Sequence, residues 1–93
     1  MIDVRIDEER LVDLALRAVS IPSFTGDELP LAEFMRDTFA GMGLQVQVQE
    51  IEPGRANVLG IRPGAGGGKT LMFNGHLDTS VLPPPAQIGR AHV

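Results

Sequence analysis

A histidine and an aspartate two positions apart are the residues of this chain best suited to chemistry. His76 and Asp78 belong to the segment Gly75-His76-Leu77-Asp78. In an extended chain, residues i and i+2 point to the same face, so the carboxylate can accept a hydrogen bond from one imidazole nitrogen. Such a contact selects the tautomer and makes the other nitrogen a better metal ligand. The spacing therefore predicts a zinc histidine with an orienting carboxylate, although a structural histidine near a turn explains most isolated pairs of this kind.

A glycine-rich stretch, Gly64–Thr70, indicates a second possible chemistry, because it resembles a phosphate-binding loop. The pattern G-x-x-x-x-G-K-S/T needs a glycine at position 63, which is Pro63. Such a loop also opens a helix whose N-terminus faces the phosphates, whereas an apolar strand is expected after Thr70. We favour a flexible hairpin connection, and keep a small nucleotide-binding module using this loop as the alternative.

Two helices are expected ahead of these motifs. The first ends near Ser20, because Ile21 precedes Pro22 and is driven out of the helical region. For the second helix, Asp27 as N-cap places Pro30 in the first turn, where backbone amides have no partner within the helix and the missing N–H of proline is tolerated. A cap at Thr25 would place Pro30 further into the helix, where that N–H is needed. Apolar residues at helical spacing predict the buried stripes, Leu11, Leu14, Ala15, Ala18 and Val19 in the first helix and Leu31, Phe34, Met35, Phe39 and Met42 in the second.

Three strands are expected to follow the second helix, which Gly41-Met42-Gly43 ends. Residues 44–51 alternate apolar and polar side chains, as in a half-exposed strand. Residues 57–61 form the next strand after a Pro53-Gly54 turn, and Thr70–Asn74 is a short apolar strand of the kind buried on both faces. The order ααβββ predicts an α/β fold in which helices pack on a sheet.

Composition narrows the class of protein. The 93 residues contain no cysteine, which removes thiolate zinc sites and cysteine nucleophiles and fits a cytoplasmic location. No apolar run reaches the roughly 18 residues of a membrane span, and the acidic N-terminus is unlike a signal peptide. The net charge is −4, and no basic stripe indicates a nucleic-acid partner. We therefore expect neither a membrane nor a nucleic acid as partner.

The sequence around His76 closely resembles the first metal motif of a family of zinc-dependent amidohydrolases and peptidases. This family includes acetylornithine deacetylase, succinyl-diaminopimelate desuccinylase, aminoacylase and glutamate carboxypeptidase. The resemblance runs in order and spacing over roughly the first 85 residues, so it is more specific than a single motif. Its matching segments are Val19–Ser23, Gly26–Glu28, Gly41–Leu44, Arg55–Val58 and Leu71–Pro83.

This resemblance implies that residues 1–86 are the N-terminal part of a zinc-peptidase-like catalytic domain. It implies that His76 is a zinc ligand and that Asp78, which orients it, is a catalytic residue. Two zinc ions per site, replaceable by cobalt, a small N-acyl amino acid or peptide as substrate, and a homodimer as one possible assembly of the intact protein are further implications. The motif leans toward the deacylase branch of the family, although a metallopeptidase stays open.

The family's other ligands and its general base come later in the sequence, and no Asp or Glu follows Asp78 here. A catalytic zinc takes about three ligands from the protein, and two-metal hydrolysis also needs a base. We therefore expect the parent protein to hydrolyse an amide or peptide bond, and residues 1–93 alone to be inactive. A non-catalytic αβ domain with a structural His76 is the remaining alternative, and it would have to unfold cooperatively as a monomer.

The last residues fit nothing before them. Residues 88–93 read Ile-Gly-Arg-Ala-His-Val, which is what the string ATC GGA AGA GCA CAC GTC, followed by the stop codon TGA, encodes in a common DNA sequencing adapter. The adapter's preceding AG would complete the codon of Gln87. We interpret residues 87–93 as a non-native tail from adapter read-through, in which His92 is no ligand.

Overall fold

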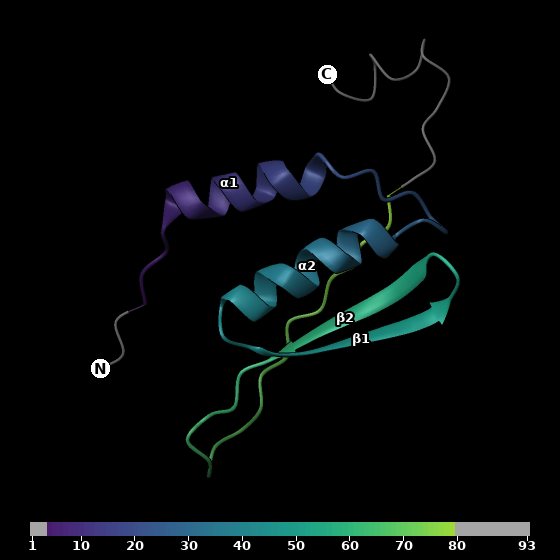
Figure 1. Cartoon of the computed structure of the whole chain (residues 1–93). Helices are drawn as coiled ribbons and strands as arrows, with labels where there is room; N and C mark the ends of the chain where they lie inside the picture. The colour runs from purple at the N-terminus through teal and green to yellow at the C-terminus, as the bar shows by residue number, and fades with distance from the viewer. Residues whose placement is uncertain (1–3, 80–93) are drawn as a thin grey trace.

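The computed structural model describes residues 4–79, which form two helices followed by a two-stranded antiparallel sheet (Figure 1). The elements are α1 (Glu8–Val19), α2 (Leu29–Gly41), β1 (Gln45–Glu52) and β2 (Arg55–Ile61). This is the expected α/β order, with two strands instead of three. Residues 87–93, interpreted as a tail, lie outside the described residues. None of the helices in residues 4–79 is long and apolar enough to cross a membrane.

The first helix, α1, ends where the sequence predicts, with Ser20 as its C-cap. The side chain of Asp7 caps it by accepting a hydrogen bond from the Arg10 amide at 3.1 Å, which satisfies one of the free donors of the first turn. At the other end, the Ser20 hydroxyl donates to the Leu16 carbonyl at 2.7 Å. No α1 residue is buried. Of the predicted stripe, Leu14 and Ala18 are half-buried and the other members are exposed.

The second helix, α2, begins one residue later than a cap at Asp27 would place it. Its N-cap is Glu28, which makes no side-chain capping bond, and Pro30 is the second helical residue. An Asp27 cap would have to accept from the Leu29 amide, because Pro30 has no N–H, and the Leu29 amide instead donates to the Gly54 carbonyl at the turn of the hairpin. The predicted end is confirmed, because α2 stops at Gly41 and Gly43 has a φ of +81°, the left-handed conformation that favours glycine.

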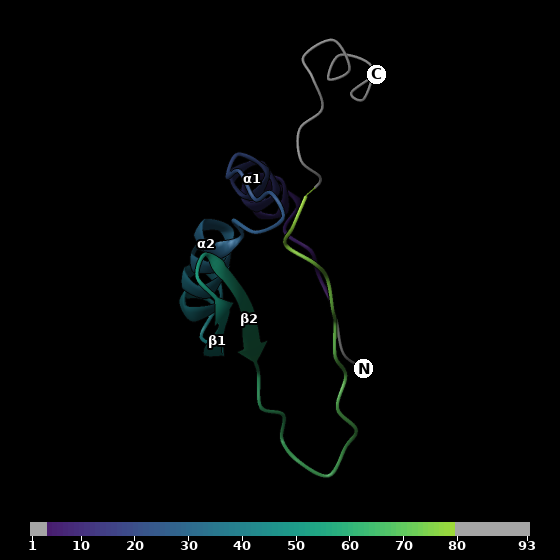
Figure 2. The ribbon, with the colours of Figure 1, turned by 90° about the vertical axis from the view of Figure 1, so that its right-hand side faces the viewer.

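The helix α2 covers one face of the β1–β2 hairpin, and α1 lies on the other side of α2 (Figures 1 and 2). The strands pair from Gln45–Ile61 to Glu52–Arg55, with an irregularity near the turn. Ala32 of α2 and Ala56 of β2 are the buried hydrophobic residues of the described chain, and no large side chain there is fully buried. The predicted stripe of α2 is half-buried, except for the more exposed Met42.

The third predicted strand, Thr70–Asn74, is wrong for this structure. Residues 62–78 contain no helix and no strand, and Leu71 and Phe73 are 77% and 88% exposed. A strand that is apolar on both faces needs covered faces and hydrogen-bonding neighbours. In residues 4–79 this segment pairs with neither β1 nor β2 and its apolar side chains stay exposed, so it runs as an irregular segment apart from the sheet (Figure 2).

Candidate functional site

The segment that carries His76 and Asp78 returns to the loop between α1 and α2. An isolated parallel bridge pairs Phe24 of this loop with Thr79. The Thr79 amide donates to the Ser23 carbonyl at 2.7 Å, and the Thr25 amide donates to the Thr79 carbonyl at 3.2 Å. In Figure 1 the yellow-green segment accordingly ends beside the loop that follows α1. The loop between the helices is therefore the support of the candidate site.

The structure brings His76 and Asp78 together as their spacing predicts. The Nδ1 atom of His76 lies 3.2 Å from Asp78 Oδ1 and 2.9 Å from the Asp78 carbonyl oxygen. A carboxylate and a carbonyl can only accept, so the neutral ring carries its proton on Nδ1. The lone pair of Nε2 is then free for a metal ion. The side chain of His76 is 84% exposed and that of Asp78 is 39% exposed, so the pair is open to solvent.

The Asp78 carboxylate has a second partner that the sequence did not reveal. Thr25 Oγ1 donates to Asp78 Oδ2 at 3.1 Å, across 53 positions of chain. From the sequence, Thr25 is considered only as an alternative N-cap of the second helix, a local role that does not predict this contact. The neighbouring Ser23 is 2% exposed, and its hydroxyl has no hydrogen-bond partner within residues 4–79. No local signal could have identified Thr25, because the contact depends on where residues 76–79 return.

An ion pair between Glu28 and Arg55 attaches the supporting loop to the hairpin. Glu28 is 6% exposed. Its carboxylate accepts from Arg55 Nε at 3.0 Å and from Nη2 at 2.7 Å, in a two-pronged contact. It also accepts from the Gly26 amide at 3.0 Å, and the Leu29 amide donates to the Gly54 carbonyl at 3.0 Å. The loop is thus held between α2 and the turn of the hairpin.

This pairing changes the acid–base properties of both groups. Hydrogen bonding from Arg55 is the main cause that lowers the pKa of Glu28 below its ordinary value of 4.5, and burial opposes it. The same contact raises the pKa of Arg55 above its ordinary value. Both groups therefore stay charged over the whole neutral range, and the support of the candidate site is ionic.

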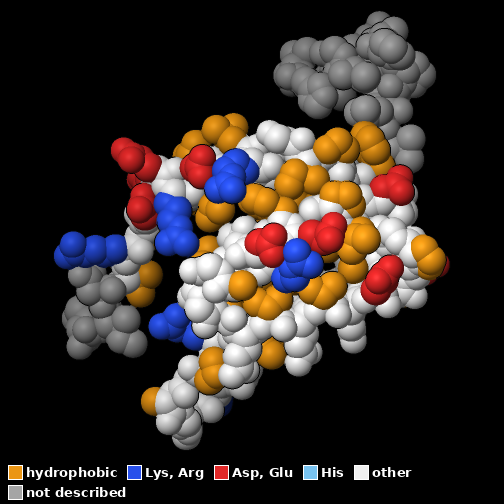
Figure 3. Space-filling view, in the orientation of Figure 1, with side chains coloured by type: hydrophobic (Ala, Val, Ile, Leu, Met, Phe, Trp, Pro, Cys, Tyr) orange, Lys and Arg blue, Asp and Glu red, His pale blue; other side chains and the backbone are white. Residues whose placement is uncertain are grey.

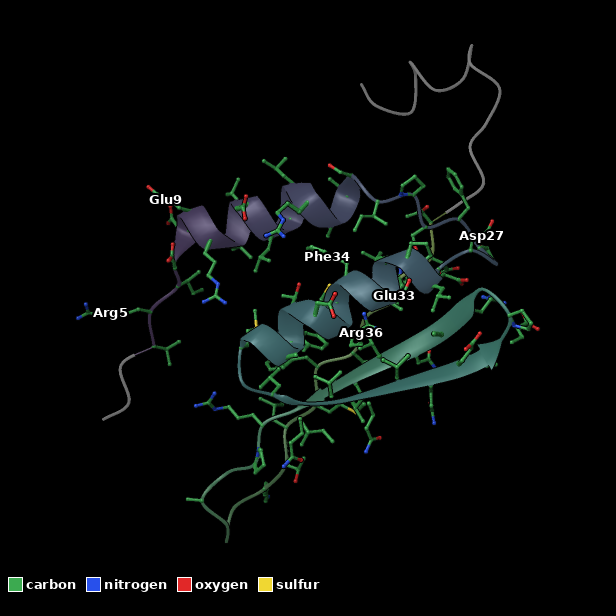
Figure 4. The ribbon with its side chains drawn as sticks, in the orientation of Figure 1. Arg5, Glu9, Asp27, Glu33, Phe34 and Arg36 are labelled. Atoms are coloured by element: carbon green, nitrogen blue, oxygen red, sulfur yellow. The ribbon has the colours of Figure 1, made fainter. Side chains whose placement is uncertain are left out.

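A cleft between the two helices lies apart from the candidate site. It has a volume of about 390 Å³, and its lining includes Arg10, Asp13, Arg17 and Phe34. Phe34 points from α2 toward α1 (Figure 4), and the Arg17 guanidinium carbon lies 5.3 Å from its ring centre. Hydrophobic side chains reach the surface over both helices (Figure 3). Neither His76 nor Asp78 lines this cleft.

The residues present can supply one ligand of a zinc site. Among residues 4–79, no group of three or more His, Asp or Glu side chains could hold a metal ion. The free Nε2 of His76, with Asp78 and the carbonyl behind Nδ1, has the arrangement that metal-binding histidines adopt. Any further ligands for a zinc ion would have to come from outside the described residues.

The glycine-rich loop Gly64–Thr70 does not have the context of a phosphate site. It is exposed, and Gly66 and Gly67 have φ values of +96° and +79°. No helix follows it within the described chain, which continues as the irregular residues 71–78. The helix N-terminus that would face a phosphate is therefore missing there.

Two hydrolases are among the known proteins to which this chain is similar. A LysW-lysine hydrolase of Deinococcus radiodurans is 36% identical over 87 residues, which is 94% of this chain and 22% of that protein. An acetylornithine deacetylase of Vibrio vulnificus is 35% identical over 69 residues, which is 74% of this chain and 18% of that protein. The chain thus spans about a fifth of the length of the curated relatives it matches. No family model and no solved structure matches it.

Proposed function

We propose, from the amidohydrolase family that these two relatives support, that the parent of this chain is a metal-dependent hydrolase of amide or peptide bonds. The resemblance rests on more than one motif, because the alignment with the first relative covers 94% of this chain. The single observation that carries the proposal is the contact of His76 Nδ1 with two atoms that only accept, which leaves Nε2 free to bind a metal ion.

In this proposal His76 is a metal ligand through Nε2, and Asp78 is the active-site carboxylate that orients it. Asp78 holds the imidazole ring in one tautomer and raises the basicity of Nε2. A bound zinc ion would supply acidity, because it lowers the pKa of a coordinated water molecule toward neutrality. Cobalt would substitute for zinc, and two ions per site would be expected in the intact protein.

The proposed substrate is a small N-acyl amino acid or a peptide. The support is the deacetylase name of one relative and the lysine hydrolase name of the other. A cytoplasmic location, which the lack of cysteine suggests, and a homodimeric assembly belong to the same proposal. Residues 1–93 alone would not catalyse the reaction, because one histidine cannot hold a catalytic zinc ion.

A metal titration of the 93-residue chain tests the ligand role without requiring catalysis. Zinc would be added while the side-chain nitrogen resonances of both histidines are followed by NMR spectroscopy. We expect the Nε2 signal of His76 to shift with zinc, and the shift to disappear in His76→Gln. The matched variant His92→Gln should leave it in place. Equal responses of His76 and His92 would refute a specific ligand role.

The catalytic part of the proposal needs a protein that carries these residues as its N-terminal region. In that protein, His76→Gln should abolish hydrolysis of an N-acetyl amino acid. Asp78→Asn should reduce hydrolysis by about 10- to 100-fold, as is usual when the carboxylate behind a metal-bound histidine is lost. Full activity of the His76→Gln enzyme would refute the proposal.

A further inference from the structure

The Asp78 carboxylate is held at both of its oxygen atoms. His76 Nδ1 lies 3.2 Å from Oδ1, and Thr25 Oγ1 lies 3.1 Å from Oδ2. The terminal torsion of an aspartate is broad and approximately two-fold, so one contact alone leaves the plane of the carboxylate loosely defined. Two contacts on different oxygens define that plane, and with it the direction in which Oδ1 faces the imidazole ring.

The Thr25 hydroxyl has two acceptors within reach but only one proton. Its oxygen lies 3.1 Å from Asp78 Oδ2 and 3.4 Å from the Thr79 carbonyl oxygen. The bond to the carboxylate is shorter, and a bond to an ionised acceptor is stronger than a bond to a neutral one. The proton therefore belongs to the contact with Asp78, and the Thr79 carbonyl is served by the Thr25 amide.

The backbone of Thr25 is fixed independently of this hydroxyl. The bridge between Phe24 and Thr79 uses the Ser23 carbonyl and the main-chain amide of Thr25 itself, on the two sides of Phe24. A threonine also has a stiff χ1 torsion, because its β-carbon is branched. The hydroxyl is thus presented to Asp78 from a fixed backbone by a side chain of few conformations.

We propose that Thr25 is a positioning residue of the active site, which acts on the metal ligand His76 through the Asp78 carboxylate. This inference rests on the proposed function for its importance in catalysis. The chain of contacts runs from the loop after α1, through Thr25 and Asp78, to the ring of His76. Removal of the hydroxyl frees the carboxylate plane and weakens the preference for the proton on Nδ1.

The test uses the metal-free 93-residue chain at a pH where the imidazole is neutral. Long-range proton–nitrogen NMR spectra give the ratio of the two tautomers of His76, with its signals assigned by comparison with His76→Gln. In Thr25→Val we expect the ratio of the Nδ1–H to the Nε2–H form to fall about two- to fivefold, the lower range for one net hydrogen bond. The fall is limited because the Asp78 carbonyl still accepts from Nδ1.

Two variants separate positioning from a general structural effect. Thr25→Ser keeps the hydroxyl and should restore most of the tautomer ratio. Thr38→Val removes a hydroxyl whose hydrogen bond goes to the Phe34 carbonyl of its own helix, α2, and should not change the ratio. The Thr79 amide, which donates to Ser23, reports whether the bridge is intact in each variant.

The proposal is overturned if Thr25→Val keeps the wild-type ratio, or if Thr25→Ser loses it while the Thr79 amide stays bonded. These outcomes do not depend on zinc or on hydrolysis. A failed zinc titration would therefore count against the proposed function alone, and an unchanged tautomer ratio would count against the role of Thr25 alone.

Discussion

A methyl group at Gly60 would disturb the packing of α2 on the hairpin. A β-carbon added to Gly60 of β2 would lie 2.8 Å from Phe39 Cδ2 and 3.0 Å from both Phe39 Cγ and Leu44 Cδ1. Such contacts are too short, so the half-buried Phe39 ring must swing away from β2. Overpacking of this kind costs about 1–3 kcal/mol. Replacing glycine by alanine also restricts the unfolded chain, which returns about 0.4–1 kcal/mol.

We therefore expect Gly60→Ala to destabilise the packing of α2 against the hairpin by about 1–2 kcal/mol, a factor of about 5–30 in the equilibrium. Amide hydrogen exchange measures this locally, at the paired amides of β1 and β2. The protection factors of these amides should fall by about the same factor. If the wild-type protection factors are already smaller than that, the amides should exchange as in an unfolded chain.

Gly64→Ala is the matched control for this prediction. An added β-carbon there meets no atom within 4 Å, so its effect should stay within about 0.5 kcal/mol. Unchanged protection of the strand amides in Gly60→Ala would show that Phe39 does not pack over β2, and would refute the reasoning. Equal losses in both variants would do so as well.

Two further predictions concern the ionic contact and the size of the core. Arg55 lowers the pKa of Glu28 below its ordinary value of 4.5. The contribution of the Glu28–Arg55 pair to folding stability is therefore complete above pH 4.5, and it is lost as the pH falls through the lower pKa of Glu28 in the folded chain. Circular dichroism should show a loss of structure at acidic pH that is smaller in Glu28→Gln than in the wild type. The control Glu9→Gln, at an exposed position of α1, should behave as the wild type. Identical pH profiles of all three proteins would contradict the role of the ion pair. Among residues 4–79 the buried hydrophobic residues are alanines and no large side chain is fully buried, so unfolding exposes little further apolar surface. We therefore expect a shallow urea transition, with a slope below about 1 kcal/mol per molar, and a steep transition of a monomer would instead favour a stand-alone αβ domain.

Local features were predictable from the sequence because their causes are local. The end of α1 before Pro22, the end of α2 at Gly41, and the hairpin around Pro53-Gly54 depend on nearest neighbours along the chain. The contact between His76 and Asp78 belongs to the same group, since it follows from i, i+2 spacing. Their roles in metal binding and catalysis stay predictions.

Features set by distant residues escaped prediction. The N-cap of α2 is Glu28 and not Asp27, because the Leu29 amide, which an Asp27 cap would need, donates to the distant Gly54 carbonyl. The apolar pattern of Thr70–Asn74 correctly describes a segment that prefers burial, but a strand also needs partners. Thr25 resembled a helix cap, and its contact with Asp78 spans 53 positions.

The main-chain bridge between Thr79 and the loop after α1 affects the order in which the elements of the fold form. Thr79 and Ser23 are 56 positions apart, and closing a flexible loop of that length is entropically costly. Once α2 and the hairpin have formed, the longest segment without regular structure between Ser23 and Thr79 is residues 62–78. The loop that remains to be closed is about a third as long, which lowers the cost by about 1 kcal/mol. The closure of the site therefore depends on α2 and the hairpin, although His76 belongs to neither. If these elements loosen, an open form is populated in which the contacts that select the tautomer of His76 are lost.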